Sequence, residues 1–200
     1  MSSAGALRRV ADGFSGAVPT VDSNAEHGRW KPGIGPFEED EQVRMLVEAT
    51  RDGVGGNLTR EVDYEGTEQS CDLLYEEDGL RLPIEVKLIR FRYDNGNIDP
   101  NTFPKVFSPF PERSSSSLLT DAKKLRQSSF EDSYALLGIY YEKENEEYEQ
   151  MKASKIAGKL SIDAEYWYGI EVEPVCISRF DGLRHPHHQR GAVIAWELSD

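Results

Sequence analysis

Three ionisable side chains in two neighbouring segments have the types and spacing needed for phosphate chemistry. Asp72 begins one predicted strand, and Glu85 and Lys87 lie two positions apart in the next. Side chains alternate along a strand, so Glu85 and Lys87 share one sheet face while Val86 points to the other. Carboxylates are preferred ligands of Mg²⁺, and an ammonium group beside them stabilises phosphate charge. The set therefore predicts metal-assisted hydrolysis of a phosphodiester bond.

The residues beside this triplet distinguish it from an ordinary amphipathic strand. An acid, an apolar residue and a lysine in succession are also typical of a solvated face, and that is the preferred interpretation of an isolated triplet. Here Pro83-Ile84 and Leu88-Ile89 flank the triplet, which indicates a buried strand. Charged groups on a buried strand need partners or a metal ion.

The motif resembles the active site of the PD-(D/E)XK nucleases, the restriction-endonuclease-like superfamily. Cys71 stands before Asp72, where the family pattern has proline, while the apolar residue between Glu85 and Lys87 agrees with that pattern. The resemblance implies that Asp72, Glu85 and the Val86 carbonyl hold Mg²⁺, with Mn²⁺ as a substitute. Lys87 would then orient the water or stabilise charge on the phosphate.

The same resemblance implies a substrate and a biological setting. We expect an endonuclease that hydrolyses DNA phosphodiester bonds, in restriction or anti-phage defence or in DNA repair. Cutting both strands of a duplex would suggest a homodimer.

Two predicted helices add further candidates. The family often takes an acid from its first helix. Glu39 lies on the inward stripe of the predicted one and is preferred over the alternatives Glu38 and Glu41, although acids there also favour the helix dipole. On the second predicted helix, Lys123, Lys124 and Gln127 are candidate phosphate contacts, although a solvated helix face is the simpler interpretation of each.

Hydrophobic periodicity and turn residues predict a chain of the α/β class, and the resemblance implies a mixed central sheet flanked by helices. Residues 93–114 are predicted to form a loop. We predict a helix from Pro36, followed by strands over 59–64, 72–76 and 80–91 with a turn at 65–67. A helix over 118–128 and a strand over 133–141 come next. A charged helix over 144–160 and strands over 166–177 and 191–198 complete the chain. The first six elements match the αβββαβ core of the superfamily, with extra C-terminal strands.

Composition separates the chain into two parts. Residues 1–28 are rich in Gly, Ala and Ser and show no period, so we expect them to be disordered or loosely ordered. Residues 29–200 then form a single nuclease-like domain.

No apolar run reaches membrane-spanning length, and two cysteines are too few for a disulfide framework. We therefore expect a cytoplasmic protein with no membrane partner.

The net charge of −13 argues against general affinity for nucleic acid, although residues 79–130 carry nine Lys and Arg against five Asp and Glu. A phosphate groove fits that basic block. The alternative is a non-catalytic acidic interaction protein, either a DNA mimic or a nuclease-fold scaffold, with exposed carboxylates and no cleavage.

A second candidate metal cluster lies near the C-terminus, at His185-Pro186-His187-His188. Proline breaks regular structure there, and neither a cysteine pair nor an HExxH spacing accompanies the histidines. We interpret the tract as a surface loop.

Overall fold

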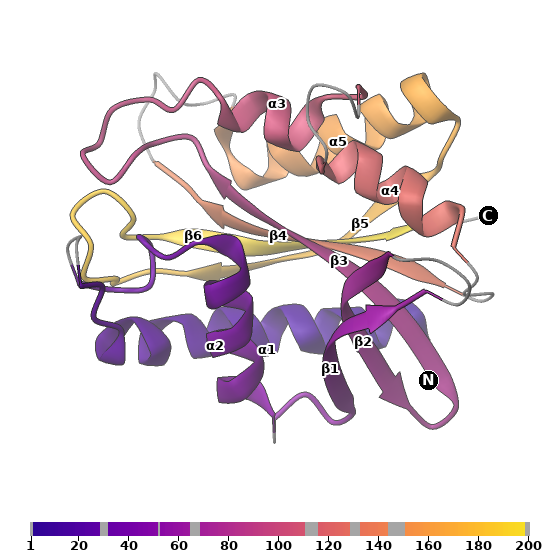
Figure 1. Cartoon of the computed structure of the whole chain (residues 1–200), viewed down its shortest axis with the longest axis horizontal. Coiled ribbons are helices and arrows are strands. Elements are labelled where there is room, and N and C mark those ends of the chain that lie inside the picture. The colour runs from indigo at the N-terminus through magenta and orange to yellow at the C-terminus, as the bar shows by residue number, and fades with distance from the viewer. Residues whose placement is uncertain are drawn as a thin grey trace.

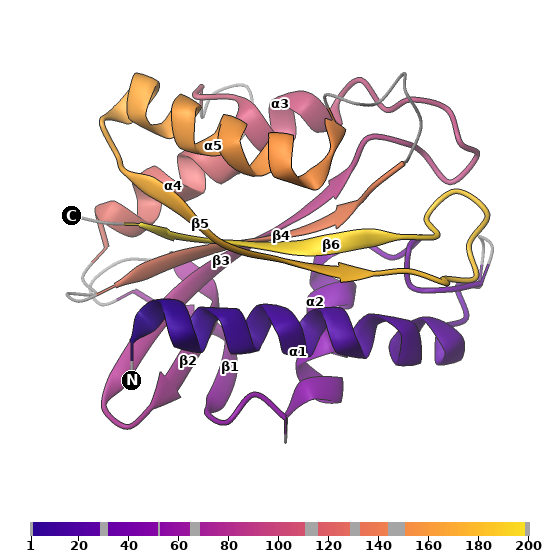
Figure 2. The same cartoon turned by 180° about the vertical axis from the view of Figure 1, so that it is seen from behind.

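The computed structural model describes residues 2–28, 32–51, 53–64, 69–110, 116–128, 133–143 and 151–198. Within these ranges an open six-stranded sheet separates two layers of helices (Figures 1 and 2). The strands are β1 (Asn57–Asp63), β2 (Ser70–Glu77), β3 (Leu80–Arg90), β4 (Tyr134–Tyr141), β5 (Val172–Phe180) and β6 (Gly191–Leu198). The helices are α1 (Ser3–Asn24), α2 (Glu39–Thr50), α3 (Thr102–Phe107), α4 (Leu118–Arg126) and α5 (Ala153–Tyr168). None of the described helices has the length and apolar character to cross a membrane.

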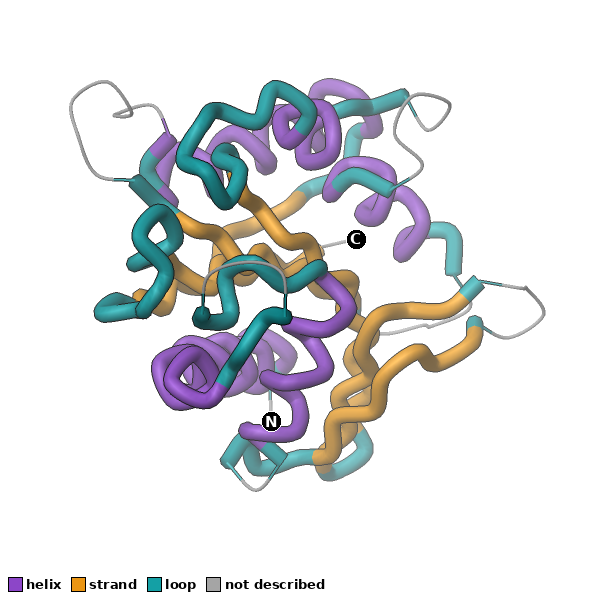
Figure 3. The backbone as a smooth tube through the Cα atoms, turned by 60° about the vertical axis from the view of Figure 1, so that its left-hand side comes forward, coloured by secondary structure: helices purple, strands orange, loops and turns teal. Residues whose placement is uncertain are grey.

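The strand order is β1-β2-β3-β4-β6-β5, and all neighbours are antiparallel except β3 and β4. A parallel pair needs a crossover connection, which here contains α3 and α4. The mixed sheet flanked by helices confirms the predicted α/β class. β1, β2 and β3 form a meander (Figure 3), and Asp78 and Gly79 make its second turn at φ angles of 49° and 85°.

Each face of the sheet has its own hydrophobic core. Helices α1 and α2 cover one face, and α3, α4 and α5 cover the other (Figure 2). Alternation along β3 sends Ile84 and Val86 into the core beneath α1 and α2. Glu85 and Lys87 share the opposite face, as predicted, and α4 covers that face.

Several predicted boundaries are wrong for local reasons. Pro36 does not begin a helix, because the Phe37 N–H closes a turn on the Ile34 carbonyl at 3.0 Å and α2 begins at Glu39. The predicted loop over 93–114 contains the short helix α3. In its described part, the charged helix begins at Ala153 and continues to Tyr168, so β5 starts later than predicted. The turn predicted at 65–67 lies outside the described residues.

The prediction that residues 1–28 are disordered or loosely ordered is wrong. They contain α1, which lies along the sheet (Figure 2). Its small residues hid an apolar stripe that packs into the core beneath the sheet, made of Ala6, Leu7, Val10, Ala11, Phe14 and Val18. Ser2 begins the helix by accepting a hydrogen bond from the Gly5 N–H. The N-terminal segment is therefore part of the folded unit.

Phe14→Ala should lower the free energy of unfolding by about 3–5 kcal/mol, because the Phe14 ring is fully buried. Gly16→Ala is the matched control: Gly16 is exposed on the same helix, and alanine there should stabilise by about 0.5–1 kcal/mol. Urea unfolding followed by circular dichroism measures both changes. Two neutral substitutions would contradict the docking of α1.

Candidate functional site

Lys87 lies at the centre of a buried charged cluster on the α4 side of β3. Its side chain is nearly inaccessible, and its Nζ lies 3.3 Å from Glu39 Oε1 and 3.4 Å from Asp121 Oδ2. The ammonium group also donates to the Ser116 hydroxyl at 2.6 Å. Burial alone would lower the pKa of Lys87, but Asp121 and Glu39 outweigh it and raise that pKa above its ordinary value.

Glu39 reaches the cluster from the first turn of α2. One carboxylate oxygen accepts from Lys87, and the other accepts from the Leu88 backbone N–H at 2.5 Å. Burial raises the pKa of Glu39 in spite of both contacts. The structure thus brings the predicted acid of the first helix to the site, where it links α2 to the backbone of β3.

Glu85 is the most desolvated acid of the predicted triplet, with 2% of its surface exposed. Its Oε1 accepts from the Tyr64 hydroxyl at 2.6 Å and lies 2.7 Å from the Lys124 ammonium. Burial, followed by repulsion from Asp72 and Asp121, raises the pKa of Glu85 to about 8. The site therefore disfavours the ionised form of this carboxyl, and the Lys124 ammonium opposes that effect.

Asp72 lies beside Glu85 across the β2–β3 ladder. Its neighbour Leu73 pairs with Ile84, which puts Asp72 next to Glu85 in the register. Asp72 Oδ2 accepts from the Val86 backbone N–H at 2.6 Å. The predicted set of Asp72, Glu85 and Lys87 is thus gathered in one place, with the Val86 backbone against Asp72.

Asp121 is the functional candidate that sequence reasoning missed. It lies on α4, is 4% exposed, and its Oδ2 has no hydrogen-bond partner among the described residues. Burial raises its pKa to about 6, even though Lys87 and Lys124 act in the opposite direction. The available signal was its position between Leu118 and Leu125 on the apolar stripe of α4, where a carboxylate is unexpected.

The three candidate phosphate contacts on α4 differ in placement. Lys124 points into the site, where it binds Glu85 and donates to the Ser70 carbonyl at 2.9 Å. Lys123 is exposed, and its Nζ lies 5.3 Å from the centre of the Tyr168 ring. Gln127 is exposed at the end of the helix, where its backbone N–H caps the last carbonyls. Only Lys124 of the three contacts the acidic cluster within the described residues.

The chemistry of this cluster fits a divalent cation. Four carboxylates, from Glu39, Asp72, Glu85 and Asp121, face two ammonium groups, from Lys87 and Lys124, so full ionisation leaves two negative charges uncompensated. Carboxylate oxygens suit Mg²⁺, which is commonly held by one or two of them and keeps several waters. These carboxylates do not form a compact group of three ligands. Among the described residues, three ligand atoms within 4.8 Å of one another occur only at Asp94, His185 and His188.

Those two histidines correct the interpretation of residues 185–188 as a surface loop. The segment is a loop, but His185 and His188 are 0% and 2% exposed. Their rings stack on each other with centroids 4.6 Å apart, and the His188 ring also packs edge-on against Tyr141. The proline and the absence of a cysteine pair or an HExxH spacing gave no indication that these two histidine rings are buried.

No protein-family model matches the chain, and neither the curated proteins nor the solved structures include a significant match.

The contribution of Glu85 to the stability of the metal-free protein should fall as the pH rises from about 5 to 8. Glu85 has a folded-state pKa of about 8, above its unfolded value of about 4.3, so its contribution is present at low pH and lost as the carboxyl ionises. Glu85→Gln should flatten the curve by up to about 1.4 kcal/mol per pH unit. Urea unfolding in chelator at each pH measures this slope.

Glu165→Gln, at an exposed position on α5, is the control and should leave the slope unchanged. Parallel curves for the wild-type protein and Glu85→Gln would contradict the raised pKa of the buried Glu85 carboxyl.

Proposed function

We propose that the protein is a metal-dependent endonuclease of the PD-(D/E)XK type, which hydrolyses DNA phosphodiester bonds. The observation that carries the proposal is the convergence of Asp72, Glu85 and Lys87 with Glu39 in one buried, negatively charged cluster. The succession α2-β1-β2-β3-α3-α4-β4, in which β4 is parallel to β3 and the short α3 precedes α4, supports an αβββαβ core of the restriction-endonuclease-like kind.

Each side chain has a role that follows from its contacts. Asp72 and Glu85, with the Val86 carbonyl, would hold Mg²⁺ or Mn²⁺, which lowers the pKa of a water molecule and neutralises phosphate charge when bound. Lys87 stays protonated between Glu39 and Asp121, so it can donate to a phosphate oxygen and orient the attacking water. Glu39 and Asp121 position the ammonium group.

The Lys124 ammonium forms an ion pair with Glu85 Oε1 at 2.7 Å, where a metal ion bound by Glu85 would lie. Its long side chain is partly exposed, so it can leave Glu85 and contact a phosphate of the bound DNA. In this role Lys124 neutralises Glu85 in the free protein and binds the DNA backbone in the complex.

The acidic interaction protein is less well supported by this cluster. A mimic of DNA presents exposed carboxylates at regular spacing, whereas Glu85 and Asp121 are 2% and 4% exposed and hydrogen-bonded or paired within the fold. Burying several carboxylates around a lysine is costly, which favours a site that binds a cation.

Asp72→Asn, Glu85→Gln and Lys87→Ala should each reduce DNA cleavage at least about 100-fold, because each removes a ligand or a charge that acts on the reacting phosphate. The assay uses supercoiled, linear and branched DNA with Mg²⁺, Mn²⁺ or chelator. Cleavage should require the metal ion.

Glu165→Gln and Lys155→Ala are matched controls on the exposed side of α5 and should cleave as the wild type does. Metal-dependent cleavage that survives at Asp72→Asn and Lys87→Ala would reject this site. Failure to cut any of the three DNA forms with either metal would favour the non-catalytic alternative.

A further inference from the structure

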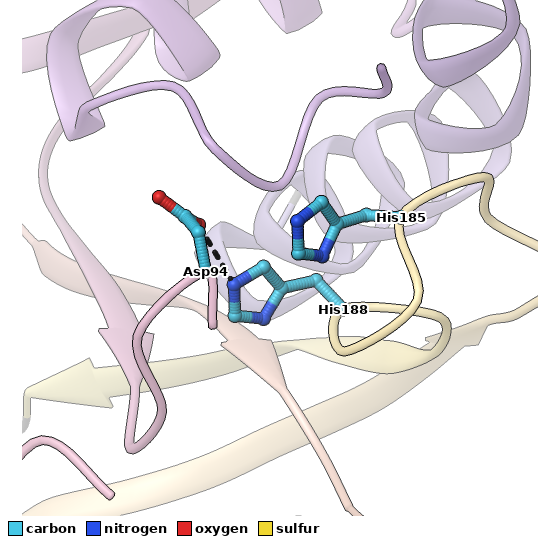
Figure 4. Close-up of side chains that lie close together, drawn as sticks. All are labelled: Asp94, His185 and His188. Atoms are coloured by element: carbon cyan, nitrogen blue, oxygen red, sulfur yellow. Dashed lines mark hydrogen bonds and ion pairs between the residues drawn. The ribbon is translucent and has the colours of Figure 1, made fainter. Parts of the chain in front are cut away.

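A second group of metal-ligating side chains lies apart from the acidic cluster. Asp94, His185 and His188 each offer one ligand atom, and these atoms all lie within 4.8 Å of one another (Figure 4). His188 Nε2 lies 3.1 Å from Asp94 Oδ1. Two ligands at zinc–nitrogen and zinc–oxygen distances of about 2.0 Å in tetrahedral geometry are about 3.3 Å apart, so this pair is already close to the required separation.

The group joins two loops that are distant in the sequence. Asp94 follows β3, in the turn closed by the Arg92–Ile98 bridge, and the histidines lie between β5 and β6. The histidine loop is also fixed to α1, because Asp22 accepts from the Arg184 backbone N–H at 2.8 Å. Residues held in place by packing and by such contacts need little reorganisation to bind an ion.

A third segment closes the group from the side of α2. Asp22 also accepts from the Ile34 N–H at 2.9 Å, which holds the turn before α2 against the same loop. In that turn, a Cβ on Gly35 would lie 2.7 Å from the Cβ of His188, so only glycine allows this approach. The group therefore lies where three loops meet.

We propose that Asp94, His185 and His188 bind one Zn²⁺-class transition-metal ion that clamps the 92–98 loop to the 181–190 loop. Imidazole nitrogen and carboxylate oxygen are ligands of Zn²⁺, whereas Mg²⁺ takes oxygen alone. Three protein ligands leave a fourth position for water. The ligand chemistry thus separates this site from the acidic cluster, which is built from oxygen donors.

Metal binding at this group must displace protons and contacts that the ligand side chains hold in the metal-free protein. His185 Nδ1 accepts from the His187 backbone N–H at 3.2 Å, so the neutral ring carries its proton on Nε2, and a ring nitrogen faces Asp94 (Figure 4). Coordination through that nitrogen displaces the proton, which moves to Nδ1 as the amide contact opens. His188 Nε2 donates its proton toward Asp94 Oδ1, so coordination there likewise shifts the His188 proton to Nδ1 by exchange with solvent. Arg90 also lies 3.8 Å from Asp94, and the metal ion must share that carboxylate with the guanidinium group.

Isothermal titration of chelator-treated protein with Zn²⁺, in millimolar Mg²⁺ to occupy the acidic cluster, tests the proposal. The wild type should bind one equivalent with submicromolar affinity, and Zn²⁺ should raise the melting temperature. Asp94→Asn and His188→Gln, which preserve size, should weaken binding at least 100-fold. Co²⁺ should give a visible absorption band in the wild type that both variants lose.

His187→Gln is the matched control from the same loop, and Glu85→Gln is the control for the acidic cluster; both should keep the high-affinity equivalent. Circular dichroism of each variant confirms that it is folded. The proposal is overturned if the wild type binds no Zn²⁺ equivalent tightly, if Asp94→Asn and His188→Gln bind as the wild type does, or if Glu85→Gln abolishes binding.

Discussion

The fold around β3 depends on how one buried ammonium group is neutralised. Lys87 lies inside the protein between Glu39 and Asp121, and because Lys87 and Asp121 are both buried, either would be strongly destabilising without the other. Because Glu39 comes from α2 and Asp121 from α4, the ion pairs connect helices on two sides of the sheet to its central strand. Glu85 and Asp72 add negative charge that the two lysines do not cancel, and the proposed metal ion would neutralise this excess.

Topology explains why these groups meet. The meander places Asp72 beside Glu85, and the parallel pairing of β3 with β4 requires a crossover that returns over the sheet. That crossover packs α4 against the face of β3 that carries Glu85 and Lys87. Asp121 therefore reaches Lys87, and Lys124 reaches Glu85. On the opposite face the same strand is apolar and packs beneath α1 and α2. β3 thus contributes to a hydrophobic core on one face and to the charged cluster on the other.

Alternation within β3 was sufficient to predict the shared face of Glu85 and Lys87, and the inward stripe of the first predicted helix pointed to Glu39. Asp121 escaped notice because a single acid on a helical stripe resembles any charged helix position until the strand beneath it is known. Helix α1 was missed because small residues dilute its apolar stripe. The burial of His185 and His188 depends on contacts with Gly35 and Asp94, which no local pattern encodes.

Anomalous diffraction from crystals soaked in Mn²⁺ tests the central claim most directly. The account predicts an anomalous peak bound by carboxylate oxygens of Asp72 and Glu85, with the Lys124 ammonium displaced from its present ion pair with Glu85. Density that shows Lys124 still paired with Glu85 and no Mn²⁺ between these carboxylates, at a concentration that occupies other sites, would contradict it.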